Sequence, residues 1–307
     1  MVFTWKEVKI QVLDGTELMK DDMGLYGPEG LPHNLIATSF AVRARRLVGV
    51  RLSDEEKGMM QRYVQSRVLL SGLAMAENRS DEDETVSFLQ ATSAAHLLCQ
   101  AGEVEVCFRP SSGDREWWTT QCREIDYQFK NREILEAVCE RAMDAVAVAE
   151  AWNLPEFKET VFQSVLRMSK LFGDYSVNGV LTGVLVFCGR AAEVPMSHYE
   201  MLYNVEASGQ GIEKLRSWDF GRGVMMLVMR GLELYPEETV WETANLVATR
   251  TLRFLNDIEW WNLSAKELYL ATEAWLMATK VTTGVYPDDA WIDPSPWGLY
   301  PERSTMK

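Results

Sequence analysis

The chain has 307 residues, of which 47% are hydrophobic and 25% are charged, and its formal net charge is −14. This composition is too apolar for general disorder, and the acidic balance argues against nonspecific binding of nucleic acid by the whole surface. The 11 tryptophans need a core or an interface in which to be buried. We therefore expect one large globular domain or two domains of ordinary size.

Neither an export signal nor a membrane span is expected. No secretory apolar region follows Met1, and no uninterrupted apolar run is long enough to cross a bilayer. The 5 cysteines are irregularly spaced and include no Cys-x-x-Cys pair, which indicates reduced thiols. We predict a cytoplasmic or otherwise intracellular protein, a virion component being one option, that is not secreted.

The first part of the chain is predicted to be extended. Residues 2–13 alternate roughly between apolar and polar side chains, which is typical of a strand or an extended arm. Residues 14–32 are rich in glycine and proline, and this indicates an irregular linker. We therefore expect an N-terminal extended arm and linker over residues 1–33.

Helical patterns begin at Asn34 and predict an N-terminal helical lobe over residues 34–152. Ser53 and Glu56 form a capping box, in which each side chain satisfies a free backbone N–H of the other residue. This box opens a helix expected over residues 54–76. The segments that follow are an acidic loop at 77–84, a helix at 84–99, a short strand at 103–108, and helices at 117–130 and 132–152.

A C-terminal helical lobe is predicted over residues 153–284. Its most apolar helix, at 176–192, is expected to be central. Further capping boxes occur at Ser197–Glu200 and Ser264–Glu267. The remaining helices are expected at 155–173, 212–234, 236–256 and 265–282. About ten helices with short connections predict an all-α globular body, in one or two lobes, with at most minor β structure.

The chain changes character over residues 285–307. Its four prolines exclude a helix interior, yet the segment is rich in tyrosine and tryptophan. Such rings must lie on a surface, either of this subunit or of a neighbour. We predict a C-terminal arm, and the residues expected to join neighbouring subunits are Phe3, Trp5, Trp291, Trp297 and Tyr300.

Seven basic residues and only three acidic ones lie between positions 43 and 67 of this acidic chain. Arginine suits backbone phosphates because it is permanently charged and forks to two oxygens. The predicted nucleic-acid-binding residues are Arg43, Arg45, Arg46, Arg51, Arg62 and Arg67. Lys57, Arg62 and Arg67 are five residues apart, about 140° around a helix, so they share no single face. The alternative is a solvated surface whose arginines pair with nearby acids.

No catalytic residue, metal site or cofactor is predicted. The histidines, His33, His96 and His198, are far apart and lack ligand spacing. The acids over residues 288–293 lie in a proline-rich segment and do not complete the aspartate patterns of helical diphosphate enzymes. A glycine-flanked helix start at 208–211 is a weak anion-binding signal by itself.

These features favour a non-enzymatic function. We predict a self-assembling nucleoprotein or coat-like protein that encapsidates single-stranded RNA in a basic groove. Its partners would be further copies of itself and RNA, with terminal arms exchanged between neighbouring subunits. Two alternatives remain: an all-α enzyme with an aromatic pocket of the diphosphate or isoprenoid type, and a protein–protein interaction module without nucleic acid.

Overall fold

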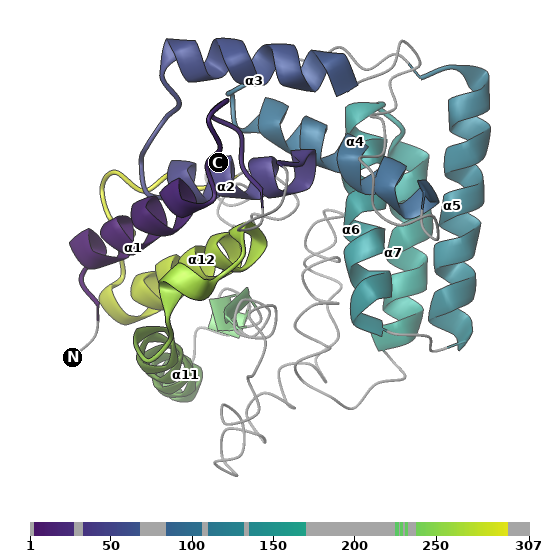
Figure 1. The fold of residues 1–307 in the computed structure, drawn as a ribbon. Helices are drawn as coiled ribbons and strands as arrows, with labels where there is room; N and C mark the ends of the chain where they lie inside the picture. The colour runs from purple at the N-terminus through teal and green to yellow at the C-terminus, as the bar shows by residue number, and fades with distance from the viewer. Residues whose placement is uncertain are drawn as a thin grey trace.

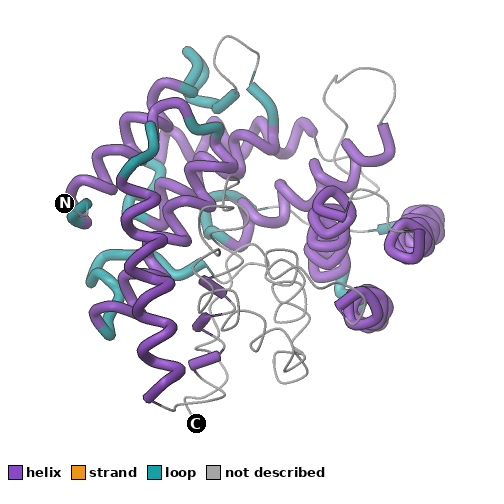
Figure 2. Tube along the Cα trace, turned by 90° about the horizontal axis from the view of Figure 1, so that it is seen from below, coloured by secondary structure: helices purple, strands orange, loops and turns teal. Residues whose placement is uncertain are grey.

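The computed structural model describes residues 3–27, 33–67, 84–105, 110–131, 135–169 and 238–293, together with 225–226, 228–229 and 231–232. Every regular element in these ranges is a helix, which confirms the predicted all-α class (Figure 2). The elements are α1 (Trp5–Leu18), α2 (Leu35–Leu47), α3 (Asp54–Arg67), α4 (Glu84–Gln100), α5 (Ser112–Asn131), α6 (Leu135–Ala151), α7 (Pro155–Ser169), α11 (Glu238–Asn256), η3 (Trp260–Asn262) and α12 (Ala265–Thr283).

The helices form two groups with α4 between them (Figure 1). In one group α2 and α11 pack on α12, and α1 contacts both α2 and α12. In the other group α5, α6 and α7 pack on one another, while α4 contacts α2 and α6. The first two and the last two described α-helices therefore share one group. The domain boundary predicted at residue 153 falls between α6 and α7, which pack together.

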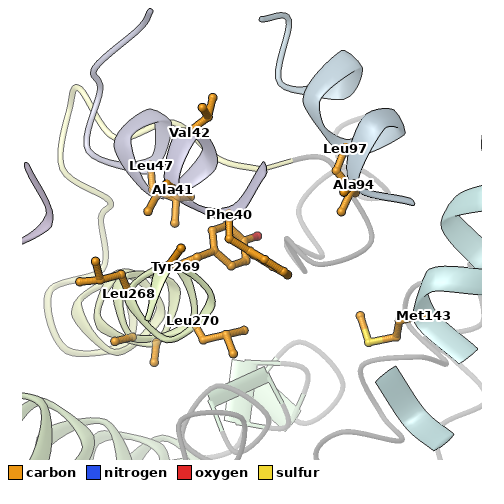
Figure 3. Packing of buried hydrophobic residues seen from close by; sticks show 14 of the residues in the cluster. Phe40, Ala41, Val42, Leu47, Ala94, Leu97, Met143, Leu268, Tyr269 and Leu270 are labelled. Atoms are coloured by element: carbon orange, nitrogen blue, oxygen red, sulfur yellow. The ribbon is translucent and has the colours of Figure 1, made fainter. Parts of the chain in front are cut away.

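Helix α12 is the centre of the first group. Leu268, Tyr269 and Leu270 are successive residues and all are buried, so this helix is surrounded by protein. Phe40 of α2 lies against it, with 5.6 Å between the ring centroids of Phe40 and Tyr269 (Figure 3). Because α2 and α12 are far apart in the sequence, this contact joins an early and a late part of the chain in one core.

Local capping sets where several helices begin. Ser264 and Glu267 form both hydrogen bonds of the capping box at the start of α12, at 3.3 and 2.8 Å. Asn34 caps α2 through a 2.7 Å bond from the Ala37 N–H. Helix α12 ends at Gly284, whose φ of 81° is in the left-handed region that glycine adopts without strain. These boundaries agree with the predicted ones because side chains within one turn decide them.

The N-terminal segment differs from the prediction, since it forms helix α1 and not an extended arm. Thr4 and Glu7 make a capping box that starts the helix. Val8, Val12 and Gly15 all face the body, which is helical spacing. The alternating pattern was misleading because Ile10, which also fits the alternation, is exposed.

Of the other predicted elements, one differs from the structure and several lie outside the described residues. Glu103–Glu105 forms no strand, although Val104 is buried. The predicted end of the helix at 54–76, the central helix at 176–192 and the capping box at 197–200 lie outside the described residues. Among the helices that the structure describes, none combines the length and the apolar character needed to cross a membrane.

The capping box of α3 generates a pH-dependent prediction. Burial alone would raise the pKa of Glu56, but the ion pair with Lys20 and the hydrogen bonds with Ser53 lower it to about 2. The ordinary pKa of the same carboxyl in an unfolded chain is near 4.5. Its ionised form therefore stabilises the fold fully above pH 4.5, and this stabilisation is lost as the pH falls toward 2.

We expect Glu56→Gln to lower the free energy of unfolding by about 1 kcal/mol near neutral pH. The difference from the wild-type chain should shrink as the pH falls through the window between the two pKa values. Urea unfolding at several pH values measures it. The neighbouring exposed residue supplies the control, since Glu55→Gln should change stability by less than about 0.5 kcal/mol. A Glu56→Gln effect of equal size throughout that window would contradict the prediction.

Candidate nucleic-acid interface

Arg43 of α2 lies inside the core, and its side chain is fully buried. Its Nε and Nη2 atoms donate to Oδ2 of Asp293 at 2.8 and 2.5 Å. Nη2 also donates to the Tyr269 hydroxyl at 2.8 Å, and that hydroxyl lies 2.7 Å from Oε1 of Glu273. The guanidinium is thus surrounded by polar groups from α12 and from the C-terminal segment.

The charges around Arg43 keep it ionised. Burial would lower the pKa of Arg43, but the charge of Asp293, with Tyr269 and Glu273, raises it above its ordinary value. In this arrangement the guanidinium is out of reach of a ligand in solution. Arg43 was predicted as a phosphate contact, and the structure instead places it in an ion pair with a residue 250 positions along the chain.

Arg46 and Lys57 converge on one carboxylate. The buried side chain of Glu103 lies 3.2 Å from Arg46 and 3.5 Å from Lys57, so it joins α2, α3 and the segment after α4. Burial lowers the pKa of Arg46, and nearby Arg51 lowers it as well, while Glu103 opposes both. The guanidinium of Arg46 also lies over the ring of Trp291, 5.1 Å from its centroid.

The remaining predicted arginines point elsewhere. Arg45 faces α1, where its Nη1 lies 3.4 Å from Glu17. Arg67 lies over the Tyr63 ring at the end of α3, with 5.5 Å from its Cζ to the centroid. Arg51 and Arg62 are exposed. The structure therefore brings Arg46 and Arg51 together near the C-terminal end of α2 and buries Arg43 in the core, and it leaves Arg45, Arg62 and Arg67 outside this group.

The C-terminal segment 285–293, which we name the strap, lies across α1 and α2 of its own chain. Asp289 accepts a 2.6 Å hydrogen bond from the Trp5 indole and pairs with Lys9. The Trp291 N–H donates to the Leu47 carbonyl at 3.1 Å. With Asp293 on Arg43, these contacts fix the strap along most of its length.

Three of the five residues predicted to join subunits have partners within the chain. Trp5 stacks on Trp275 with centroids 5.5 Å apart, and Phe3 meets the edge of Trp260 at 6.3 Å. Trp291 lies under Arg46, as described above. Trp297 and Tyr300 lie outside the described residues.

Gly49 explains how closely the strap approaches the body. Its φ is 82°, and a Cβ atom built there would lie 2.5 Å from the Asp289 carbonyl oxygen. Any other residue would clash with the strap backbone and would also strain its own backbone. Glycine at this position is therefore a requirement of the docked strap.

Two further features of the described residues bear on metal binding and on cavities. The described residues contain no group of three or more histidine, cysteine or carboxylate side chains arranged to hold a metal ion. His96 and Cys99 lie on α4, and the imidazole is 3.8 Å from Glu150. A cavity of about 600 Å³ is lined by residues of α5 and α7, where Asp126 accepts hydrogen bonds from Ser164 and Arg167 at 2.6 and 2.8 Å.

Comparison with models of known protein families, with curated proteins and with solved structures gives no match. The interface therefore has to be interpreted from its own chemistry.

Sequence reasoning missed four residues of this interface: Lys9, Glu103, Asp289 and Asp293. The acids of the strap were noticed, but only as an incomplete metal motif. A signal was present in the segment Asp289–Asp293, where carboxylate, indole and carboxylate occur at every second position. Without the fold, nothing indicated which cations this pattern would meet.

The Arg43–Asp293 pair generates a test by double-mutant cycle. Removing one member of a buried ion pair leaves the other charge uncompensated, so Asp293→Asn and Arg43→Met should each lower the free energy of unfolding by about 3 kcal/mol. The double variant should lose clearly less than the sum, because it leaves no lone charge. Urea unfolding measures all four chains.

Asp288 provides the control for this cycle, because it is exposed and adjacent to the strap contacts. Asp288→Asn should change stability by less than about 0.5 kcal/mol. Additive losses for the Arg43 and Asp293 variants would show that the two side chains are not coupled.

Proposed function

We propose that this chain is a non-enzymatic, self-assembling nucleoprotein or coat-like protein that binds single-stranded RNA. The observation that carries the proposal is the position of Arg46, Arg51 and Lys57 where the end of α2 approaches α3. In a chain of net charge −14, such a group restricts an anionic polymer to one part of the surface. Arginine is suited to phosphate because its planar fork donates to two oxygens at once.

The outer face of α3 extends this group. Figure 1 shows α3 at the edge of the molecule, and only Met60, Tyr63 and Val64 of this helix are buried. Arg62 is exposed on it, and Arg67 lies at its end beside an aromatic ring. Phosphates and bases of a single strand are bound by such combinations of cations and rings.

Exposed apolar side chains support self-assembly. Ile10 and Leu18 of α1, Met23 after it, and Trp241 and Trp261 around α11 all remain exposed. Large exposed aromatic and aliphatic groups are the usual anchors of protein interfaces. These side chains are therefore available for contacts between copies.

Size-exclusion chromatography with absorbance at two wavelengths tests the assembly. We expect the purified protein to elute well above its monomer mass of 35.0 kDa, with the raised ultraviolet ratio of bound nucleic acid. Treatment with ribonuclease should change both the size and the ratio. A monomer free of nucleic acid that stays unchanged when RNA is added at low salt would refute the proposal.

The outer cations should set the salt dependence of RNA binding. For single strands the slope of log affinity against log salt is about −0.7 per neutralised phosphate. Replacing Arg51, Arg62 and Arg67 together by glutamine should therefore make the slope shallower by about 2. Fluorescence anisotropy of a labelled oligouridylate at several salt concentrations measures it.

A matched control removes the same charge elsewhere. Arg115 and Arg123 of α5 and Arg253 of α11 are exposed and distant in sequence from α2 and α3. Their triple replacement by glutamine should change the slope by less than about 1. Equal effects of the two triple variants would mean that only net charge matters and that no interface exists at α2 and α3.

A further inference from the structure

We propose that the strap occupies a binding groove for single-stranded RNA and that its side chains stand where phosphates and a base would lie. The groove consists of Lys9 from α1 and Arg43 and Arg46 from α2. The inference rests on the RNA-binding function proposed above, and it names the groove and what controls access to it.

The strap presents its groups in the order found along a nucleic-acid strand. The carboxylate of Asp289 pairs with Lys9, the indole of Trp291 lies under Arg46, and the carboxylate of Asp293 binds Arg43. Asp289 lies in a turn that the Ala290 N–H closes on the Pro287 carbonyl at 3.0 Å, and Trp291 and Asp293 follow it at every second position. Arginine stacks on bases much as Arg46 lies on this indole.

The two arginines have partners in the body of the protein besides the strap. Tyr269 hydrogen-bonds Arg43, and Glu273 bonds that tyrosine from the other side. Glu103 holds Arg46 independently of the strap. Cations positioned by the body of the protein form a preorganised site for an anion, whichever anion fills it.

The attachment of the strap to α12 allows it to be displaced from α1 and α2. Its first residue, Val285, is 64% exposed and follows Gly284, whose left-handed φ allows the chain to turn. The helices below are held together by the seam between α2 and α12, to which Phe40 and Tyr269 contribute. Because the same cations cannot serve carboxylates and phosphates together, RNA gains access only when the strap is displaced.

The experiment compares variants by anisotropy of a labelled oligouridylate. Asp289→Asn with Asp293→Asn weakens the strap, and we expect RNA affinity to rise about tenfold, which corresponds to about 1.4 kcal/mol. The control removes the same two charges at exposed positions, as Asp288→Asn with Glu238→Gln. Adding Lys9→Gln and Arg46→Gln to the strap-weakened chain should abolish the gain.

A variant that changes no charge separates the loosening of the strap from a general effect of net charge. Gly49→Ala places a Cβ atom where the Asp289 carbonyl lies, so it should loosen the strap and also raise RNA affinity. In the wild-type chain, saturating RNA should accelerate hydrogen exchange of the Trp291 amide, which donates to Leu47. Far-UV circular dichroism confirms the fold of each variant.

The outcomes separate this inference from the function on which it rests. If the wild-type chain binds RNA, but the strap-weakened, Gly49→Ala and control chains bind it equally, the strap does not cover the site and the inference is overturned. Unchanged exchange at Trp291 under saturating RNA would overturn it too. If none of the chains binds RNA, the proposed function itself fails.

Discussion

The first group of helices is organised around a charge in its core, the ion pair between Arg43 and Asp293. Both side chains are fully buried, and such a pair is stable only when each partner has the other and further hydrogen bonds. Tyr269 and Glu273 of α12 supply those bonds. One guanidinium therefore joins three parts of the chain: helix α2, helix α12 and the strap. Helix α1 also contacts the strap, since Trp5 and Lys9 bind Asp289.

Because of this constraint, the arginines between positions 43 and 67 have different surroundings and different roles. Arg43 and Arg46 are bound by carboxylates and by Trp291, and Arg45 is bound toward α1. Arg51 and Arg62 stay in solvent. The two interpretations weighed for the sequence, a phosphate groove and arginines paired with acids, are thus not exclusive. The same cations can bind either the phosphates of a polymer or the carboxylates of the strap. Pairing with the strap is therefore compatible with a binding site that the strap covers.

The all-α class and many helix starts could be predicted because they depend on neighbours within one turn. Ser53 with Glu56 and Ser264 with Glu267 cap their helices in the structure as their spacing indicated. The prediction was wrong for residues 2–13, where alternation of apolar residues suggested extended structure. There Thr4 and Glu7 cap a helix, and packing of Gly15 against Leu268 fixes which face is buried. A pattern of a few residues fits both periods, and only the surface that it meets decides between them.

The sequence by itself determined the helical class, the acidic balance, the local caps and the presence of a basic block beside an aromatic C-terminal segment. Only the tertiary structure decided which cations that segment would reach, and that Phe3, Trp5 and Trp291 find partners within one chain. The physical reason is the range of the interactions. Capping bonds act over three or four residues, whereas the pairs of Arg43 with Asp293 and Lys9 with Asp289 join positions 250 and 280 residues apart. Contacts of that range follow from how helices pack, and the composition of either segment does not specify them.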